Sequence, residues 1–132
     1  MTREPSHLAV MLPGLLGLDH VGIAVADVES AIRFYCDVLG LRVVHREDNA
    51  EQQVAEIMLA NSDPGPVGSQ LQLLMPLTEN SVVNRFLMRR GPGLHHVAYA
   101  VSDVRSASSI LRRRGVRSEE HTSELQSLRT IS

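Results

Sequence analysis

Two stretches of the chain share one pattern of hydrophobic and polar positions. Residues 18–31 recur as residues 94–107, at an offset of 76, with nine identities in fourteen positions. In each copy a short alternating run rich in valine predicts a strand. An aspartate then predicts a helix N-cap, and apolar residues at helical spacing follow it. We therefore expect two copies of one supersecondary unit.

The first copy continues into a longer module. Its strand, residues 20–25, precedes a helix that Asp27 is expected to cap and Gly40 to end. Further apolar alternation predicts three more strands, at residues 41–46, 53–60 and 70–75. This order of one strand, one helix and three strands predicts an α+β fold built from βαβββ modules.

The second predicted module is shorter than the first. A helix at residues 81–90 is expected to link the two modules, and the second module supplies a strand and a helix, which Asp103 caps and Gly115 ends. From Ser118 onward the chain has few apolar residues and no strand alternation. The fold class is therefore α+β with paired βαβββ modules, of which the second is incomplete.

Strand alternation places the two repeated histidines on a face with little side-chain bulk. Successive side chains of a strand point to opposite faces, so His20 shares its face with Gly22 and Ala24. His96 shares its face with two alanines, and the large branched residues of both strands face the other way. A curved sheet of this kind is expected to leave a cavity into which each half projects one histidine.

Two further polar residues fall on strands that are expected to line the same cavity. Glu56 lies among apolar neighbours on the third strand, and Gln72 alternates with leucines on the fourth. Two imidazoles with amide and carboxylate oxygens suit a borderline divalent ion such as cobalt, manganese, nickel, iron or zinc. Each residue taken alone also fits a plainer role, because strand histidines are commonly hydrogen-bonded and strand glutamates and glutamines commonly face water.

The other four histidines show no comparable pattern. We interpret His7, His45 and His121 as surface residues. Alternation places His95 on the strand face opposite His96, which favours a structural role for it.

Composition excludes several classes of function. Thirteen basic and fifteen acidic residues give a net charge of −2, so no net field attracts nucleic acid or an anionic membrane. All the basic residues are arginine, which excludes Schiff-base lysine chemistry and a Walker-type phosphate loop. A single cysteine, Cys36, excludes an internal disulfide framework and indicates a reducing, cytoplasmic compartment.

The chain resembles the vicinal oxygen chelate superfamily, which has the glyoxalase and dioxygenase fold. Within it, the chain resembles the family of methylmalonyl-CoA epimerases, over residues from about 18 to 117. The matching strings are LDHVGIAV, NAEQQVAEIML, SQLQLLMPL and GPGLHHVAYAVSDV. The strings VAEIML and QLQLL separate epimerases from their relatives better than the histidines do.

The resemblance implies curved sheets that enclose a divalent metal ion. Carried over residue by residue, it implies metal ligands at His20, Gln72 and His96 and a catalytic carboxylate at Glu56. The implied reaction interconverts (R)- and (S)-methylmalonyl-CoA by α-proton abstraction through a metal-stabilised enediolate. Cobalt is the expected ion, with manganese, nickel and zinc as alternatives. The implied partners are an acyl-CoA substrate and, where the full-length fold forms, a second copy of the chain.

The end of the sequence departs from the family pattern. The family's last metal ligand, which also serves acid–base chemistry, lies on a final strand of the form GVLxEL, and this chain has no such string. The string RSEEHTSELQS resembles a translated sequencing adapter, so we expect a truncated, inactive or poorly folded chain with a non-native tail. The predicted organisation is a leader at 1–17, a first module at 18–77, a linker helix at 78–93, the start of a second module at 94–117 and the tail at 118–132.

Two other functions remain open at this point. A different enzyme of the same fold, such as a glyoxalase I, requires glutathione contacts, for which the sequence offers no candidates. A metal-free small-molecule binding module of the same fold predicts no metal uptake. Analysis of the metal content separates the binding module from the enzymes.

Overall fold

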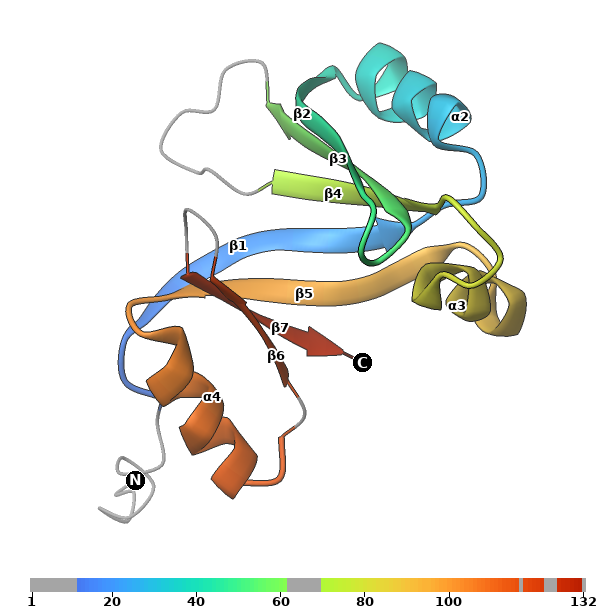
Figure 1. Ribbon diagram of the computed structural model, residues 1–132. Coiled ribbons are helices and arrows are strands. Elements are labelled where there is room, and N and C mark those ends of the chain that lie inside the picture. Colours follow the sequence, from blue (N-terminus) through green and yellow to red (C-terminus); the bar gives the residue numbers. More distant parts are fainter. Residues whose placement is uncertain (1–11, 62–69, 117, 123–125, 132) are drawn as a thin grey trace, which may run out of the picture.

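Seven strands form one strongly curved sheet in the order β2-β3-β4-β1-β5-β7-β6 (Figure 1). The computed structural model describes residues 12–61, 70–116, 118–122 and 126–131. The strands are β1 (Leu15–Ala24), β2 (Leu41–Asn49), β3 (Val54–Asn61), β4 (Gln70–Pro76), β5 (Gly93–Val101), β6 (Ser118–Thr122) and β7 (Gln126–Ile131). The helices are α2 (Val28–Ile32), its π-helical continuation η1 (Arg33–Val38), α3 (Val82–Arg90) and α4 (Val104–Arg113).

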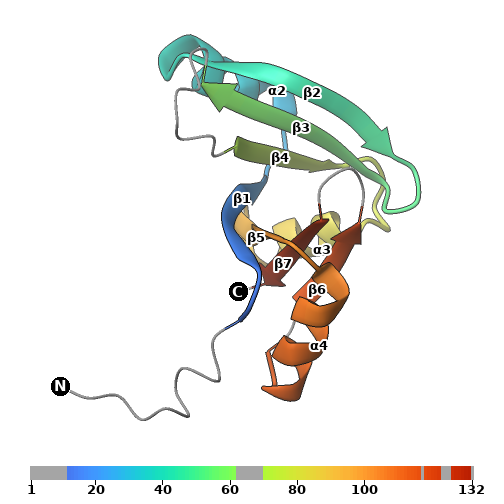
Figure 2. The same ribbon diagram turned by 90° about the vertical axis from the view of Figure 1, so that its left-hand side faces the viewer.

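The two repeated strands lie side by side at the centre of the sheet. β1 pairs with β5 in antiparallel orientation and with β4 in parallel orientation. Figure 2 shows β2, β3 and β4 on one side of this central pair and β6 and β7 on the other, with the sheet bending between them. The repeat found in the sequence therefore becomes a junction at which its two copies touch.

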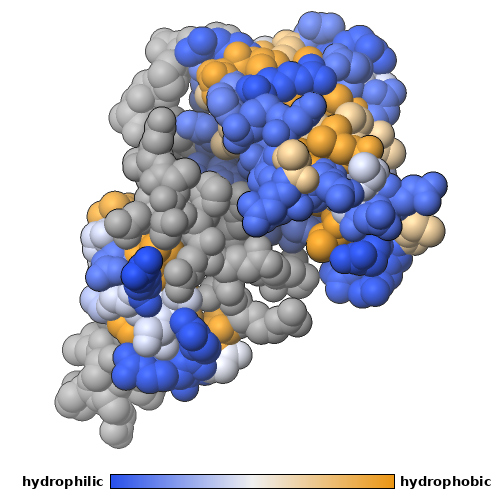
Figure 3. Space-filling view, viewed as in Figure 1, coloured by the Kyte–Doolittle hydropathy of each residue, from blue (hydrophilic) through white to orange (hydrophobic). Residues whose placement is uncertain are grey.

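The two faces of the sheet carry different cores. The outer face packs against α2 and η1, where Val28 meets Ile57 and Leu73. As the alternation predicted, Ile23 and Val25 of the first repeat belong to this core. The exposed surface over α2 is hydrophilic, as expected of an amphipathic helix (Figure 3). On the inner face a smaller core joins Ala24 to α3.

The C-terminal backbone differs from the expectation. The sequence predicted no strand after Ser118, yet β6 and β7 form there, and β7 pairs with β5 from His96 opposite Ile131 to Ala100 opposite Ser127. An unpaired edge of β5 offers hydrogen-bonding groups to any extended segment, whatever its hydrophobic pattern. Among the described residues the second module therefore has three strands, β5, β6 and β7, where the sequence predicted one.

The start of the chain also differs in part from the expectation. Residues 1–11 of the predicted leader lie outside the described residues, but Leu15 and the two residues after it already belong to β1. No helix among the described residues is long and apolar enough to span a bilayer.

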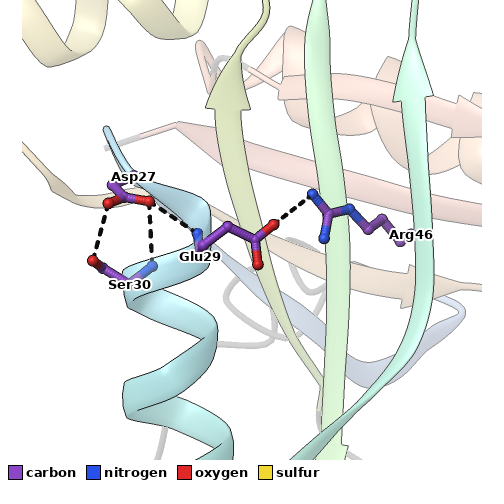
Figure 4. Close-up of polar contacts among 4 residues, drawn as sticks. All are labelled: Asp27, Glu29, Ser30 and Arg46. Carbon is purple, nitrogen blue, oxygen red and sulfur yellow. Dashed lines mark hydrogen bonds and ion pairs between the residues drawn. The ribbon is translucent and has the colours of Figure 1, made fainter.

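The predicted helix caps form as expected. The carboxylate of Asp27 accepts hydrogen bonds from the backbone N–H groups of Glu29, at 3.1 Å, and Ser30, at 3.3 Å. The hydroxyl of Ser30 also donates to it, and Glu29 pairs with Arg46 of β2 (Figure 4). The backbone N–H of Ser30 is the largest of the contacts that lower the pKa of Asp27. Asp103 caps α4 in the same way through Ser106.

Replacing Asp27 is expected to destabilise the start of α2. Asp27→Ala is expected to lower the thermal midpoint at neutral pH. Asp27→Asn keeps an acceptor for the N–H groups, so it is expected to lower the midpoint less. Because folding lowers the pKa of Asp27, its contribution is present above the unfolded value and is lost as the pH falls below about 4. Thermal unfolding at pH 7 and pH 3 tests this. A gap between wild type and Asp27→Ala that stays the same at both pH values contradicts it.

Candidate active site

A row of three residues crosses the centre of the inner face. Gly22 of β1 lies between Gln72 of β4 and His96 of β5, its partners in the two ladders. Residues opposite each other on paired strands project to the same face. Gly22 has no side chain, and the ring of His96 fills the space above it. A Cβ atom at Gly22 would lie 2.2 Å from Cε1 of His96.

The two repeated histidines meet on this face. Nε2 of His20, from β1, lies 3.2 Å from Nε2 of His96, from β5. The rings are nearly perpendicular, at 86°, and their exposed fractions are 4% and 1%. Two buried imidazoles therefore face each other through the same kind of nitrogen.

Both histidines are also held at their other ring nitrogen. Nδ1 of His20 lies 2.7 Å from a carboxylate oxygen of Asp19, and Nδ1 of His96 lies 2.9 Å from Nδ1 of His95. The sequence placed His95 on the opposite face, and this expectation is wrong. A bulge in β5 between Leu94 and His96 interrupts the alternation and turns His95 toward its neighbour. The repeat, which aligns His95 with Asp19, is the one signal in the sequence that pairs these two positions.

Gln72 adds a buried acceptor to the face. Its side chain is 4% exposed, and its Oε1 atom has no hydrogen-bond partner among the described residues. A buried polar atom without a partner costs free energy, so native structures place a ligand, water or ion beside most such atoms. Gln72 therefore marks a point on this face where a bound group is expected.

Glu56 lies on the same face, one strand further out. It is 8% exposed, and its partner in the β3–β4 ladder is Leu74. Met58, two residues along β3, is opposite Gln72, so Glu56 and Gln72 project to the same face. Val54 and Leu74, which are also buried, give the carboxylate apolar neighbours on this face.

The donor atoms fit a divalent cation. Two nitrogen ligands about 2.1 Å from an ion and about 90–110° apart lie roughly 3 Å from each other, which agrees with the 3.2 Å between the two Nε2 atoms. The amide oxygen of Gln72 is a harder donor that needs a partner. Among the described residues no group of three His, Cys, Asp or Glu side chains could hold a metal. The donor set available there is therefore two imidazoles and one amide.

A surface cavity lies beside His95, the residue next to His96. It has a volume of about 280 Å³ and lies between the β2–β3 turn and the start of α3. Gln53, Ser81 and His95 are among the residues that line it. His95 therefore connects the buried histidine pair with a space large enough for part of a small organic molecule.

Comparisons with known proteins agree on one family. The model of the Glyoxalase/Bleomycin resistance protein/Dioxygenase superfamily matches residues 19–130. An uncharacterized Bacillus subtilis protein, YqjC, is 45% identical over 82 residues, which cover 62% of this chain and 55% of that protein. The ethylmalonyl-CoA/methylmalonyl-CoA epimerase of Cereibacter sphaeroides is 34% identical over 101 residues, 76% of this chain and 72% of the relative. Against YqjC and several other curated relatives, the chain spans little more than half of their length.

Solved structures give the same picture. The methylmalonyl-CoA epimerase of Mycobacterium tuberculosis has a TM-score of 0.72 and 44% identity, and the match covers 83% of this chain and 73% of that one. A methylmalonyl-CoA epimerase in complex with methylmalonyl-CoA and NH4+ has a TM-score of 0.71 and 39% identity, with coverage of 83% and 79%.

The space above Gly22 can be tested by filling it. Gly22→Ala is expected to lower the free energy of unfolding by about 1–3 kcal/mol, because the new methyl group overlaps the ring of His96. Removing that ring should relieve the overlap, so the same substitution in a His96→Ala background is expected to cost less. Urea unfolding of the four proteins in this double-mutant cycle measures the coupling. Equal costs in both backgrounds would show that the ring does not occupy this space.

Proposed function

The chain belongs to the Glyoxalase/Bleomycin resistance protein/Dioxygenase superfamily, and on that premise we propose that it acts on methylmalonyl-CoA as a metal-dependent epimerase. One observation supports this proposal above the others: two buried histidine Nε2 atoms lie 3.2 Å apart on the sheet face that also holds Gln72 and Glu56. Relatives that are methylmalonyl-CoA epimerases, one of them solved with methylmalonyl-CoA, support the choice of substrate.

His20, His96 and Gln72 are the residues that would hold the cation. Two imidazole nitrogens and one amide oxygen suit a borderline divalent cation, and the resemblance to the epimerase family implies cobalt, with manganese, nickel or zinc as alternatives. When bound, the cation supplies positive charge that stabilises the enediolate form of the thioester. The three ligands come from three adjacent strands, so the packed sheet fixes their spacing before any substrate arrives.

Glu56 is the residue that we assign to proton transfer. Its carboxylate takes the proton from the carbon between the thioester and the free carboxylate. The electron pair of that C–H bond forms a C=C bond to the thioester carbon, and the π pair of the C=O bond moves to the thioester oxygen. Its burial among apolar side chains keeps bulk water from competing for the proton. Return of a proton to the opposite face of the carbon produces the other epimer.

The opposite face requires a second proton donor. Among the residues whose side chains the structure describes, Glu56 is the only buried carboxylate. A proton that Glu56 itself returns restores the starting epimer, and if that proton has exchanged with solvent, the product carries the solvent isotope without inversion. We therefore expect this chain to exchange the α-hydrogen for deuterium faster than it inverts the stereocentre.

Two further properties belong to the same proposal. We place the protein in the cytoplasm, because a single half-buried cysteine suits a reducing compartment. We also expect it to form a homodimer, as the resemblance to the epimerase family implies.

The test compares deuterium exchange in wild type, Glu56→Gln and Glu29→Gln. The purified chain, loaded with Co²⁺ in D₂O, is expected to label methylmalonyl-CoA at the α-carbon, and Glu56→Gln to lower this rate about 10²–10⁴-fold. Glu29→Gln is the matched control, because the side chain of Glu29 is exposed and pairs with Arg46 in an exposed contact. Mass spectrometry follows the label and chiral analysis follows inversion.

Three outcomes would contradict the proposal. Labelling that survives Glu56→Gln at the wild-type rate would remove Glu56 from proton transfer. Labelling that continues after a chelator has removed the metal would show that proton transfer does not need the cation. Absence of metal uptake together with tight binding of a small molecule would instead favour the metal-free binding module.

A further inference from the structure

The residue before each site histidine contacts the Nδ1 atom of that histidine. Asp19 meets His20 at 2.7 Å, and His95 meets His96 at 2.9 Å. Asp19 and His95 occupy equivalent positions in the two copies of the repeat. The arrangement is therefore duplicated with the modules, although the two residues differ in chemistry.

A bulge makes each of these contacts possible. In a regular strand, neighbouring side chains point to opposite faces, so neither contact could form. The β1–β5 register shifts between Leu18 and His20, which leaves Asp19 as an extra residue in β1. It shifts again opposite Gly22 and Ile23, which leaves His95 as an extra residue in β5. Bulges of this kind redirect a side chain at the cost of ladder hydrogen bonds.

We propose that Asp19 and His95 are positioning residues, which set the ring nitrogen that carries hydrogen in the neighbouring histidine. Asp19 thereby leaves the Nε2 electron pair of His20 available to a divalent cation, and His95 can accept the hydrogen that His96 carries on Nδ1 when Nε2 of His96 binds the same cation. This inference rests on the proposed function for the identity of the cation site, but its effect on the rings is present without any cation.

Asp19 fixes His20 in the state that a ligand needs. An ionised carboxylate can only accept a hydrogen bond, so Nδ1 of His20 carries the hydrogen and donates it to Asp19. Nε2 of the neutral ring then keeps its electron pair. Carboxylates commonly orient metal-bound histidines in this way.

His95 controls His96 by a different route. Nε2 of His20 is an acceptor, so at 3.2 Å Nε2 of His96 must donate the hydrogen between them. Nδ1 of His96 is then the acceptor for the Nδ1–H of His95. To bind a cation, His96 must carry its hydrogen on Nδ1 instead, and His95 must accept it there and carry its own hydrogen on Nε2. Both rings stay neutral, and no proton is lost overall.

His95 is well held for this task. Its ring packs edge-to-face against Phe86 of α3, with the centroids 5.0 Å apart, so the inner core fixes the plane of the imidazole. The ring also lines the 280 Å³ cavity. A molecule bound in this cavity would therefore contact the residue that sets the state of His96.

Cation affinity tests the proposal with paired variants. Asp19→Ala and His95→Ala are each expected to weaken Co²⁺ or Zn²⁺ binding about 10–100-fold by calorimetry. Asp19→Asn and His95→Asn keep an amide oxygen that can accept from Nδ1–H, so they are expected to recover most of the affinity. His45→Ala is the matched control, because His45 is an exposed histidine outside the site.

Nitrogen NMR of histidine-labelled protein provides a readout without metal. In wild type, His20 is expected as the Nδ1–H form, and Asp19→Ala is expected to populate the Nε2–H form while Asp19→Asn does not. If His20 is in the Nδ1–H form in wild type but the protein binds no cation, the proposed function is overturned and the positioning role stands. Tautomers and cation affinity that stay unchanged in both alanine variants would overturn the positioning role.

Discussion

The contact between His20 and His96 depends on the antiparallel pairing of β1 with β5. Each strand comes from one copy of the repeat, so neither module alone can bring the two Nε2 atoms within 3.2 Å of each other. The glycine at position 22 gives the ring of His96 its space. The outer core, which anchors β1 through Ile23 and the strand's end through the adjacent Val25, holds this pairing from the other side of the sheet.

This arrangement places polar groups where burial is costly. Both histidines and Gln72 are almost fully buried, and burial of a polar group without a partner costs free energy. The histidines satisfy their ring nitrogens through each other and through Asp19 and His95. Gln72 keeps an acceptor without a partner among the described residues. A bound cation would give this oxygen of Gln72 a partner.

Much of this arrangement could be predicted from the sequence. Strand alternation and the repeat together placed His20, His96, Gln72 and Glu56 on one face, and the ladders agree with that placement. Their roles as ligands and base stay predictions. Asp27 and Asp103 were predicted as caps because their contacts are local, within three residues of each carboxylate.

The bulges and the strand character of β7 could not be predicted, because they depend on contacts between distant parts of the chain. The bulges that redirect Asp19 and His95 exist only because β1 and β5 pair out of register, which no pattern within either strand reveals. β7 forms against the edge of β5, so its strand character comes from its partner and not from its own hydrophobic pattern. Both differences have the same cause, because backbone pairing across the sheet overrides local sequence preference.

The central claim is that one imidazole from each repeat binds the same cation. X-ray absorption spectroscopy of the chain loaded with one equivalent of Co²⁺ or Zn²⁺ counts these ligands directly, because imidazole rings give characteristic multiple scattering. We expect two imidazoles in wild type and one in either His20→Ala or His96→Ala. A wild-type spectrum with no imidazole, or with only one, would contradict the claim.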